Sequence, residues 1–107
     1  MAYDEVDPIL LPWLRRHGLH VFKRVRDYEV RHIEVVDDVG DRYQIGVSET
    51  DVAGNVTVFA GNYLRKTKQK SVKYSSSLSG LERTLEDAYS KIMEWVAQEG
   101  HTRTPVL

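Results

Sequence analysis

The feature that most constrains the fold is a helical stripe of apolar residues near the C-terminus, within residues 79–99 (SGLERTLEDAYSKIMEWVAQE). The apolar positions recur at spacings of three and four, as on one face of an α-helix. They are Leu81, Leu85, Ala88, Tyr89, Ile92, Trp95 and Val96. Ser79 and Glu82 have the spacing of a capping box, and Gly100 suits the left-handed residue that ends a helix. We therefore predict one long amphipathic helix, which needs an apolar surface to lie on.

A second, shorter helix is predicted near the N-terminus, in the segment DPILLPWLRRHG. Asp7 can cap this helix with Pro8 at the first helical position. Pro12 complicates the prediction, because proline lacks an N–H and its ring crowds the preceding turn. The segment forms either a turn at residues 7–10 followed by a short helix from Pro12, or one kinked helix that ends at Gly18. In both cases the residues expected to be buried are Ile9, Leu10, Trp13 and Leu14.

Between the two helices the apolar pattern has a period of two, which is typical of β-strands. Strands are expected at residues 19–28, 30–36, 42–48 and 56 to about 64, with a last strand that carries Val72 and Tyr74. Turns are expected at residues 27–28, 37–41, 51–55 and about 65–70. Gly61 and Asn62 could instead form a two-residue hairpin turn. That register would put Arg65 opposite Val58 on the buried face, so we favour the longer strand.

This order of elements predicts an α+β fold with two layers: an antiparallel β-meander of four or five strands, preceded by a short helix and followed by a long one. The 107 residues suit a single domain, with residues 1–7 and 101–107 as frayed tails. The long helix is expected to pack on one face of the sheet. Its stripe spans close to five turns, which matches four or five strands about 4.8 Å apart. The opposite face would remain open.

The composition excludes several classes of function. The chain has no cysteine, so it has no disulfide, thiolate metal site or cysteine nucleophile, and we expect a reducing, cytoplasmic setting. No apolar run approaches the roughly 20 residues that span a bilayer, so no membrane partner is expected. The net charge of −1 gives no overall preference for nucleic acid or for an anionic membrane.

No catalytic, metal or cofactor motif stands out, so we expect no catalytic residue, no metal and no cofactor. The four histidines, His17, His20, His32 and His101, lack the spacing of a metal site. The serines at residues 75–79 lie in no nucleophile elbow, and no phosphate-binding glycine pattern is present. An enzyme with an unrecognised site would need a pocket that holds at least two of His20, His32, Glu29 and Glu34.

The clearest functional pattern is a basic stretch between Asn62 and Tyr74 without any acidic residue. Its cations are Arg65, Lys66, Lys68, Lys70 and Lys73, and Tyr63 and Tyr74 flank them. Such a cluster can dock on an acidic protein, or bind phosphates while the tyrosines stack on bases. Lysines at a hairpin tip or on an edge strand also prevent edge-to-edge aggregation. A second basic group could extend the patch: Arg15, Arg16, Lys23, Arg24 and Arg26.

The long helix has an acidic polar face, on which Glu82, Glu86, Asp87 and Glu94 outnumber Arg83 and Lys91. A molecule that is basic at one hairpin and acidic along one helix favours association over chemistry. We expect a non-enzymatic protein-binding module, of an accessory, inhibitor-like or homodimeric kind, that uses the open sheet face and the basic hairpin. Phe59 and Tyr63 are the expected exposed anchors, because aromatic residues are enriched in interface cores. The alternative is a nucleic-acid-binding module that uses the basic stretch.

Overall fold

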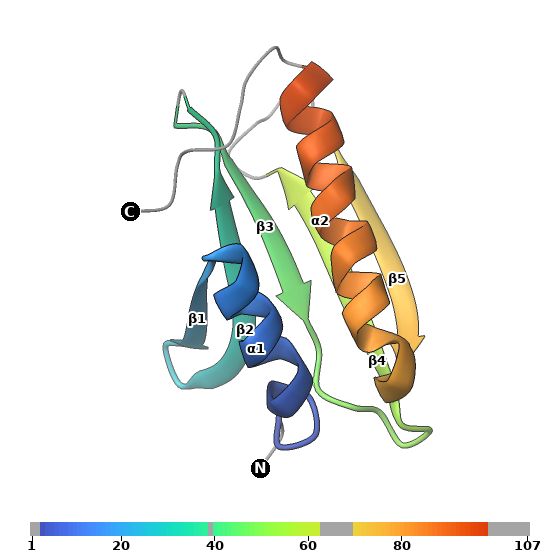
Figure 1. Cartoon of the computed structure of the whole chain (residues 1–107). Helices are drawn as coiled ribbons and strands as arrows, with labels where there is room; N and C mark the ends of the chain where they lie inside the picture. Colours follow the sequence, from blue (N-terminus) through green and yellow to red (C-terminus); the bar gives the residue numbers. More distant parts are fainter. Residues whose placement is uncertain (1–2, 39, 63–69, 99–107) are drawn as a thin grey trace.

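The computed structural model describes residues 3–38, 40–62 and 70–98. Within them the chain forms α1 (Asp7–His17), β1 (His20–Val25), β2 (Tyr28–Val36), β3 (Arg42–Val47), β4 (Asn55–Asn62), β5 (Ser71–Ser77), the 3-10 helix η1 (Leu78–Gly80) and α2 (Leu81–Gln98). The strands make one antiparallel meander in the order β1-β2-β3-β4-β5. The predicted α+β architecture is confirmed, with five strands (Figure 1).

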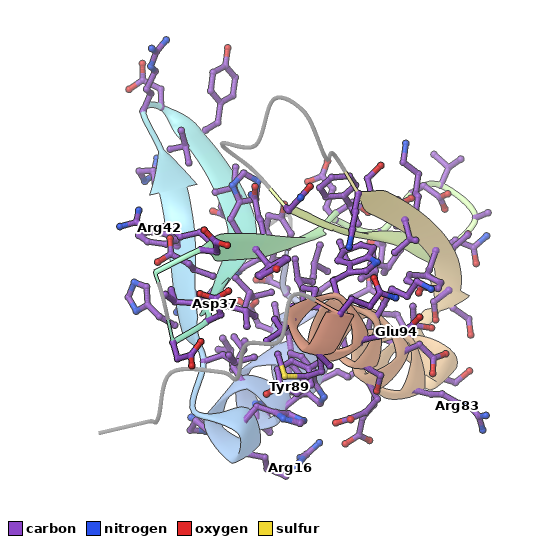
Figure 2. All side chains as sticks on the ribbon, turned by 90° about the horizontal axis from the view of Figure 1, so that it is seen from above. Arg16, Asp37, Arg42, Arg83, Tyr89 and Glu94 are labelled. Atoms are coloured by element: carbon purple, nitrogen blue, oxygen red, sulfur yellow. The ribbon has the colours of Figure 1, made fainter. Side chains whose placement is uncertain are left out.

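Both helices lie on the same face of the sheet (Figures 1 and 2). α2 runs along β4 and β5, and α1 lies beside it on the β1 and β2 side. The core between these layers takes alternate residues of the inner strands: Ile33, Val35, Tyr43, Ile45, Val47, Val56, Val58 and Ala60. From the helices it takes Leu10, Trp13, Leu14, Leu81, Leu85, Ala88, Ile92, Trp95 and Val96. The stripe predicted for the long helix is therefore buried, except that Tyr89 is half-buried at its side.

The N-terminal segment is one continuous helix through Pro12, as in the second of the two predicted alternatives. Its start differs from the prediction, because Val6 is the N-cap residue, makes no side-chain capping bond, and leaves Asp7 as the first helical residue. The Asp7 carboxylate binds Arg31 of β2 instead. The helix ends as expected at Gly18, which is left-handed at φ 61°. A contact with the sheet has thus replaced the local cap.

The start of the long helix also differs from the prediction. β5 leads into η1, where the Ser77 hydroxyl accepts a hydrogen bond of 3.3 Å from the Gly80 amide. Glu82 binds Arg16 of α1 instead of closing a capping box on Ser79. Gly100, the expected end of this helix, lies outside the described residues. No helix in the described part of the chain is long and apolar enough to cross a membrane.

The hairpins follow the predicted turns with two changes. The β1–β2 turn falls at Arg26 and Asp27, one residue earlier than expected, and Arg26 adopts a positive φ of 55°. β4 continues through Gly61 and Asn62, so the two-residue hairpin that we rejected does not form. The Asn62 amide donates to the Lys70 carbonyl at 3.1 Å, and the Lys70 amide donates to Asn62 Oδ1 at 2.7 Å. The expected tip between them lies outside the described residues.

Candidate interaction surface

The helices leave one face of the sheet uncovered within the described residues, and we call it the open face. Its side chains alternate with those of the core along each strand. The strand register aligns one residue from each strand in a central row: Phe22, His32, Gly46, Phe59 and Lys73. A second row beside it contains His20, Glu34, Gln44, Gly61 and Ser71. The open face therefore carries Phe22 on one edge strand, glycines and Phe59 on its inner strands, and Lys73 on the other edge strand.

Phe59 owes its position to the two glycines around it. A Cβ atom at Gly61 would lie 3.0 Å from Phe59 Cζ, and one at Gly46 would lie 3.9 Å from Phe59 Cδ1. The phenyl ring thus occupies the space of a side chain at Gly61 and leans over the strand next to Gly46. Phe59 remains 37% exposed and Phe22 is 44% exposed. These rings are large apolar surfaces that the described chain does not cover.

Two shallow hollows lie on the open face and share His32 and Gln44 in their walls. The larger, of about 420 Å³, lies above Gly46 and reaches Phe59 and Thr57. The other, of about 220 Å³, lies between Phe22, Val25 and Glu34. Specific ligand pockets are usually deeper and more enclosed. The two hollows instead make the open face uneven, so that side chains of a partner can fit into them.

Charges of both signs surround these rings. Glu34 lies 4.0 Å from Arg42 on the next strand, measured between Oε2 and Nη1. His20 packs edge-on against Phe22 with ring centres 4.7 Å apart. Lys73 is exposed on β5 and is the register partner of Phe59. A patch with an apolar centre and a mixed-charge rim is typical of protein interfaces.

The structure separates the residues of the predicted basic site. Phe59 and Lys73 are neighbours on the open face. Lys70 lies before β5, where its Nζ donates to Gln98 Oε1 of α2 at 3.0 Å. Tyr74 faces the helices, because its register partner is Val58, and it packs half-buried against the core. Tyr63, Arg65, Lys66 and Lys68 lie outside the described residues.

The second basic group does not join the described part of the first. Lys23 and Arg24 belong to β1 and Arg26 to the β1–β2 turn, at one edge of the sheet, whereas Lys73 is on β5 at the other edge. Arg16 is bound to Glu82 at the interface of the helices. The described members of the two basic groups therefore lie on α1, at the β1 edge and at the β5 edge, and not in one continuous patch.

One buried polar cluster fastens α1 to the sheet. Arg31 donates from Nε and Nη2 to the two carboxylate oxygens of Asp7, both at 2.8 Å, and its guanidinium carbon lies 4.2 Å above the Tyr3 ring centre. Glu29 is a further 3.6 Å from Arg31 Nη2. The hydrogen bonds from Arg31 lower the pKa of Asp7, and the pKa of Arg31 is raised by the same pair. The buried Arg31 charge is thus paired with Asp7 and lies close to Glu29, as a buried charge in a folded protein requires.

A second polar cluster fastens α1 to α2, and sequence reasoning missed it. Glu86 Oε1 accepts a hydrogen bond of 2.7 Å from Trp13 Nε1 and lies 2.5 Å from His17 Nε2. The His17 ring packs between Trp13 and Tyr89, at 4.7 and 4.6 Å between ring centres (Figure 2 shows Tyr89 beside the meeting helices). The bond to His17 lowers the pKa of Glu86. The one available signal was the i,i+4 spacing of Trp13 and His17, which puts both on one helix face.

The possible catalytic residues are only partly brought together. His32 and Glu34 line the same hollow, whereas Glu29 is engaged with Arg31. Among the residues that the structure describes, no group of three or more histidines and carboxylates could hold a metal ion. Two of the four residues named for the enzyme hypothesis, His32 and Glu34, therefore share a hollow.

Comparison with protein-family models, with curated proteins and with solved structures gave no match to this chain.

Proposed function

We propose that the chain is a protein-binding module whose contact surface is the open face of the sheet. The observation that supports this is the exposure of Phe22 and Phe59 in the central row, on a face that the helices leave uncovered. Binding energy at interfaces is usually concentrated in a few large side chains, and aromatic residues are enriched there. Because the chain lacks cysteine, we expect it to work in the reducing cytoplasm.

Site-specific photo-crosslinking tests this proposal. A benzophenone amino acid in place of Phe59 is expected to give discrete covalent adducts in cells of the source organism. The matched control carries the same amino acid in place of Arg83, which is exposed on the outer side of α2, away from the open face (Figure 2). Adducts at both positions alike, or at neither, would contradict the proposal.

Nucleic-acid binding is the second candidate, and the neighbouring Phe59 and Lys73 support it. An aromatic ring beside a cation can stack on a base while the cation contacts a phosphate. Binding should then weaken steeply between low and moderate salt. Retention on single-stranded nucleic acid should fall when Arg65, Lys66, Lys68 and Lys70 are all changed to Gln, and unchanged retention would exclude this function.

A further inference from the structure

We propose that the partner of the open face is a second copy of this chain, related by a two-fold axis that runs along β3. This inference rests on the proposed function, because it uses the same surface. Its basis is that the central row is complementary to itself about β3. An axis along the middle strand brings β2 of one copy over β4 of the other, and β1 over β5, since the sheet order is β1-β2-β3-β4-β5.

In the central row each residue then meets a chemically suited partner. Phe22 on β1 faces Lys73 on β5 of the other copy, and a cation over an aromatic ring is attractive. His32 on β2 faces Phe59 on β4, which places two rings together. Gly46 lies on the axis and faces its own copy, so the two sheets can approach closely at the centre.

The second row is also compatible with this axis. Gln44 faces Gln44, and a side-chain amide can both donate to and accept from its own copy. Glu34 faces Gly61, so the carboxylate meets no like charge. Arg42 is the one open-face cation on β3, and Glu34 of its own copy lies 4.0 Å away. Arg42 also lies on the axis and faces Arg42 of the other copy, so the neighbouring Glu34 carboxylates must offset this repulsion.

The perpendicular axis does not give this complementarity. An axis across the strands at the central row would put β1 over β1 and β5 over β5. Lys73 would then face Lys73, and His32 would face His32. Like charges placed opposite each other across an interface repel. The register therefore favours the axis along β3.

The size of the open face predicts a weak, concentration-dependent dimer. Five strands about 4.8 Å apart and seven residues about 3.4 Å apart make a patch of about 19 by about 20 Å. That is about 380 Å² on each copy and about 760 Å² for the pair, which is below the roughly 1,000 Å² that a stable specific interface buries. The dimer is therefore expected to dissociate on dilution.

Charge pairing on the axis tests this geometry. Sedimentation equilibrium of the full chain is measured from about 1 μM to about 1 mM, a range that includes the dissociation constants of weak dimers. We expect a monomer–dimer equilibrium for the unmodified chain. Gln44→Lys and Gln44→Glu should each weaken the dimer at least about tenfold, because each new charge faces its own copy. An equimolar mixture of the two variants should restore dimers, now mixed in composition.

The matched control is Thr57, which lies on β4 of the same face and off the axis. Mixing Thr57→Lys with Thr57→Glu should give no preferential pairing, because Thr57 faces β2 of the other copy. Circular dichroism should show all four variants folded. The inference would be overturned if the chain stayed monomeric at the highest concentration, or if the Gln44 variants dimerised as well as the unmodified chain. It would also be overturned if the mixed Thr57 variants paired as preferentially as the mixed Gln44 variants.

The two proposals fail in distinguishable ways. If crosslinking at Phe59 yields an adduct with a different protein while the chain sediments as a monomer, the protein-binding function stands and the self-association is wrong. If position 59 yields no specific adduct at all, both are wrong. An adduct of twice the chain mass, together with pairing at Gln44, supports both.

Discussion

At the scale of single residues, the buried polar side chains of the described chain have hydrogen-bond partners. Arg31 bonds to a distant segment, whereas Asp37 and Ser76 bond to near neighbours in the sequence. Among the described residues, no buried side-chain nitrogen or oxygen lacks a hydrogen-bond partner. Arg31 is the largest such group, since it is 6% exposed and carries a full charge. Asp7 compensates that charge with two oxygens. Loss of one partner would leave the other charge buried and unpaired, which is more costly than loss of the pair as a whole.

We therefore expect Asp7→Ala to lower the free energy of unfolding by about 3 kcal/mol, because the guanidinium stays buried. The matched control is Glu82→Ala, which removes the exposed partner of Arg16 and should cost less than about 1 kcal/mol. Urea denaturation followed by circular dichroism measures both. An equal loss of unfolding free energy in the two variants would show that Asp7 does not pair with a buried Arg31.

The glycines under Phe59 make a second residue-scale prediction. A Cβ atom at Gly61 would lie 3.0 Å from both the Lys70 carbonyl oxygen and Phe59 Cζ, and a backbone atom cannot move aside cheaply. Gly61→Ala should destabilise the protein by about 1–3 kcal/mol. Gly46→Ala meets its nearest atoms at 3.9 Å and should be neutral or stabilising by up to about 1 kcal/mol. Thermal unfolding measures the stability of both variants. A Gly61→Ala variant more stable than Gly46→Ala would contradict this account.

At the scale of elements, the joint between α1 and α2 changes the expected charge map. Two of the acidic residues on α2, Glu82 and Glu86, face α1, where they meet Arg16 and His17. Glu94 lies 3.6 Å from Lys91 on the same helix. The acidic face predicted for α2 is thus partly neutralised within the molecule. This arrangement leaves the open face as the better candidate for association.

This joint also predicts how stability depends on pH. Glu86 and Asp7 have folded pKa values below their ordinary values of 4.5 and 3.8, because His17 and Arg31 respectively bind the ionised carboxylates. A lowered folded pKa contributes stability above the unfolded pKa and loses it as the pH falls through the folded one. The free energy of unfolding should therefore fall as the pH drops below about 4.5.

Urea titrations from neutral pH down to strongly acidic pH measure this dependence. The double variant Asp7→Asn and Glu86→Gln should be less stable at neutral pH and should lose less stability on acidification. An unchanged acid slope in the double variant would show that other carboxylates cause the loss.

At the scale of the whole molecule, the two helices share one core. Trp13 of α1 is fully buried, and Trp95 of α2 stacks on Tyr43 of β3 at 6.4 Å between ring centres. Val6 and Leu10 of the N-terminal segment belong to the same cluster of buried residues. Because α1 has no separate core, it should not unfold independently of the sheet.

The variant Trp95→Phe leaves Trp13 as the single tryptophan and reports on α1 alone. Its fluorescence transition in urea should coincide with the circular dichroism transition of the same variant, because a shared core unfolds cooperatively. An earlier fluorescence transition would show that α1 detaches before the sheet unfolds.

The sequence by itself determined the order of the elements and the inner face of α2, β3 and β4. These properties follow from local periodicity: residues 81–96 repeat every three or four positions, and residues 43–47 and 56–60 alternate. Phe59 was recognised as outward-facing for the same reason. In β1 a bulge puts Val25 on the open face and not beside Val21 as the alternation suggested. The prediction that Tyr74 belongs to the binding site was less well founded. Val72 and Tyr74 are two positions apart in a strand, so they share one face, and that face is covered by the helices.

Only the tertiary structure decided which residues lie together. The central row depends on the register between strands, and the bulge between Phe22 and Arg24 in β1 shifts that register by an amount that composition does not reveal. The contact of His17 with Glu86 joins residues 69 positions apart, through the packing of α1 beside α2. Local propensity carries no information about such pairs, because they form only when two separately specified surfaces bury against each other. The open face was likewise decided by the tertiary structure, because it is uncovered only since both helices pack on the opposite face of the sheet.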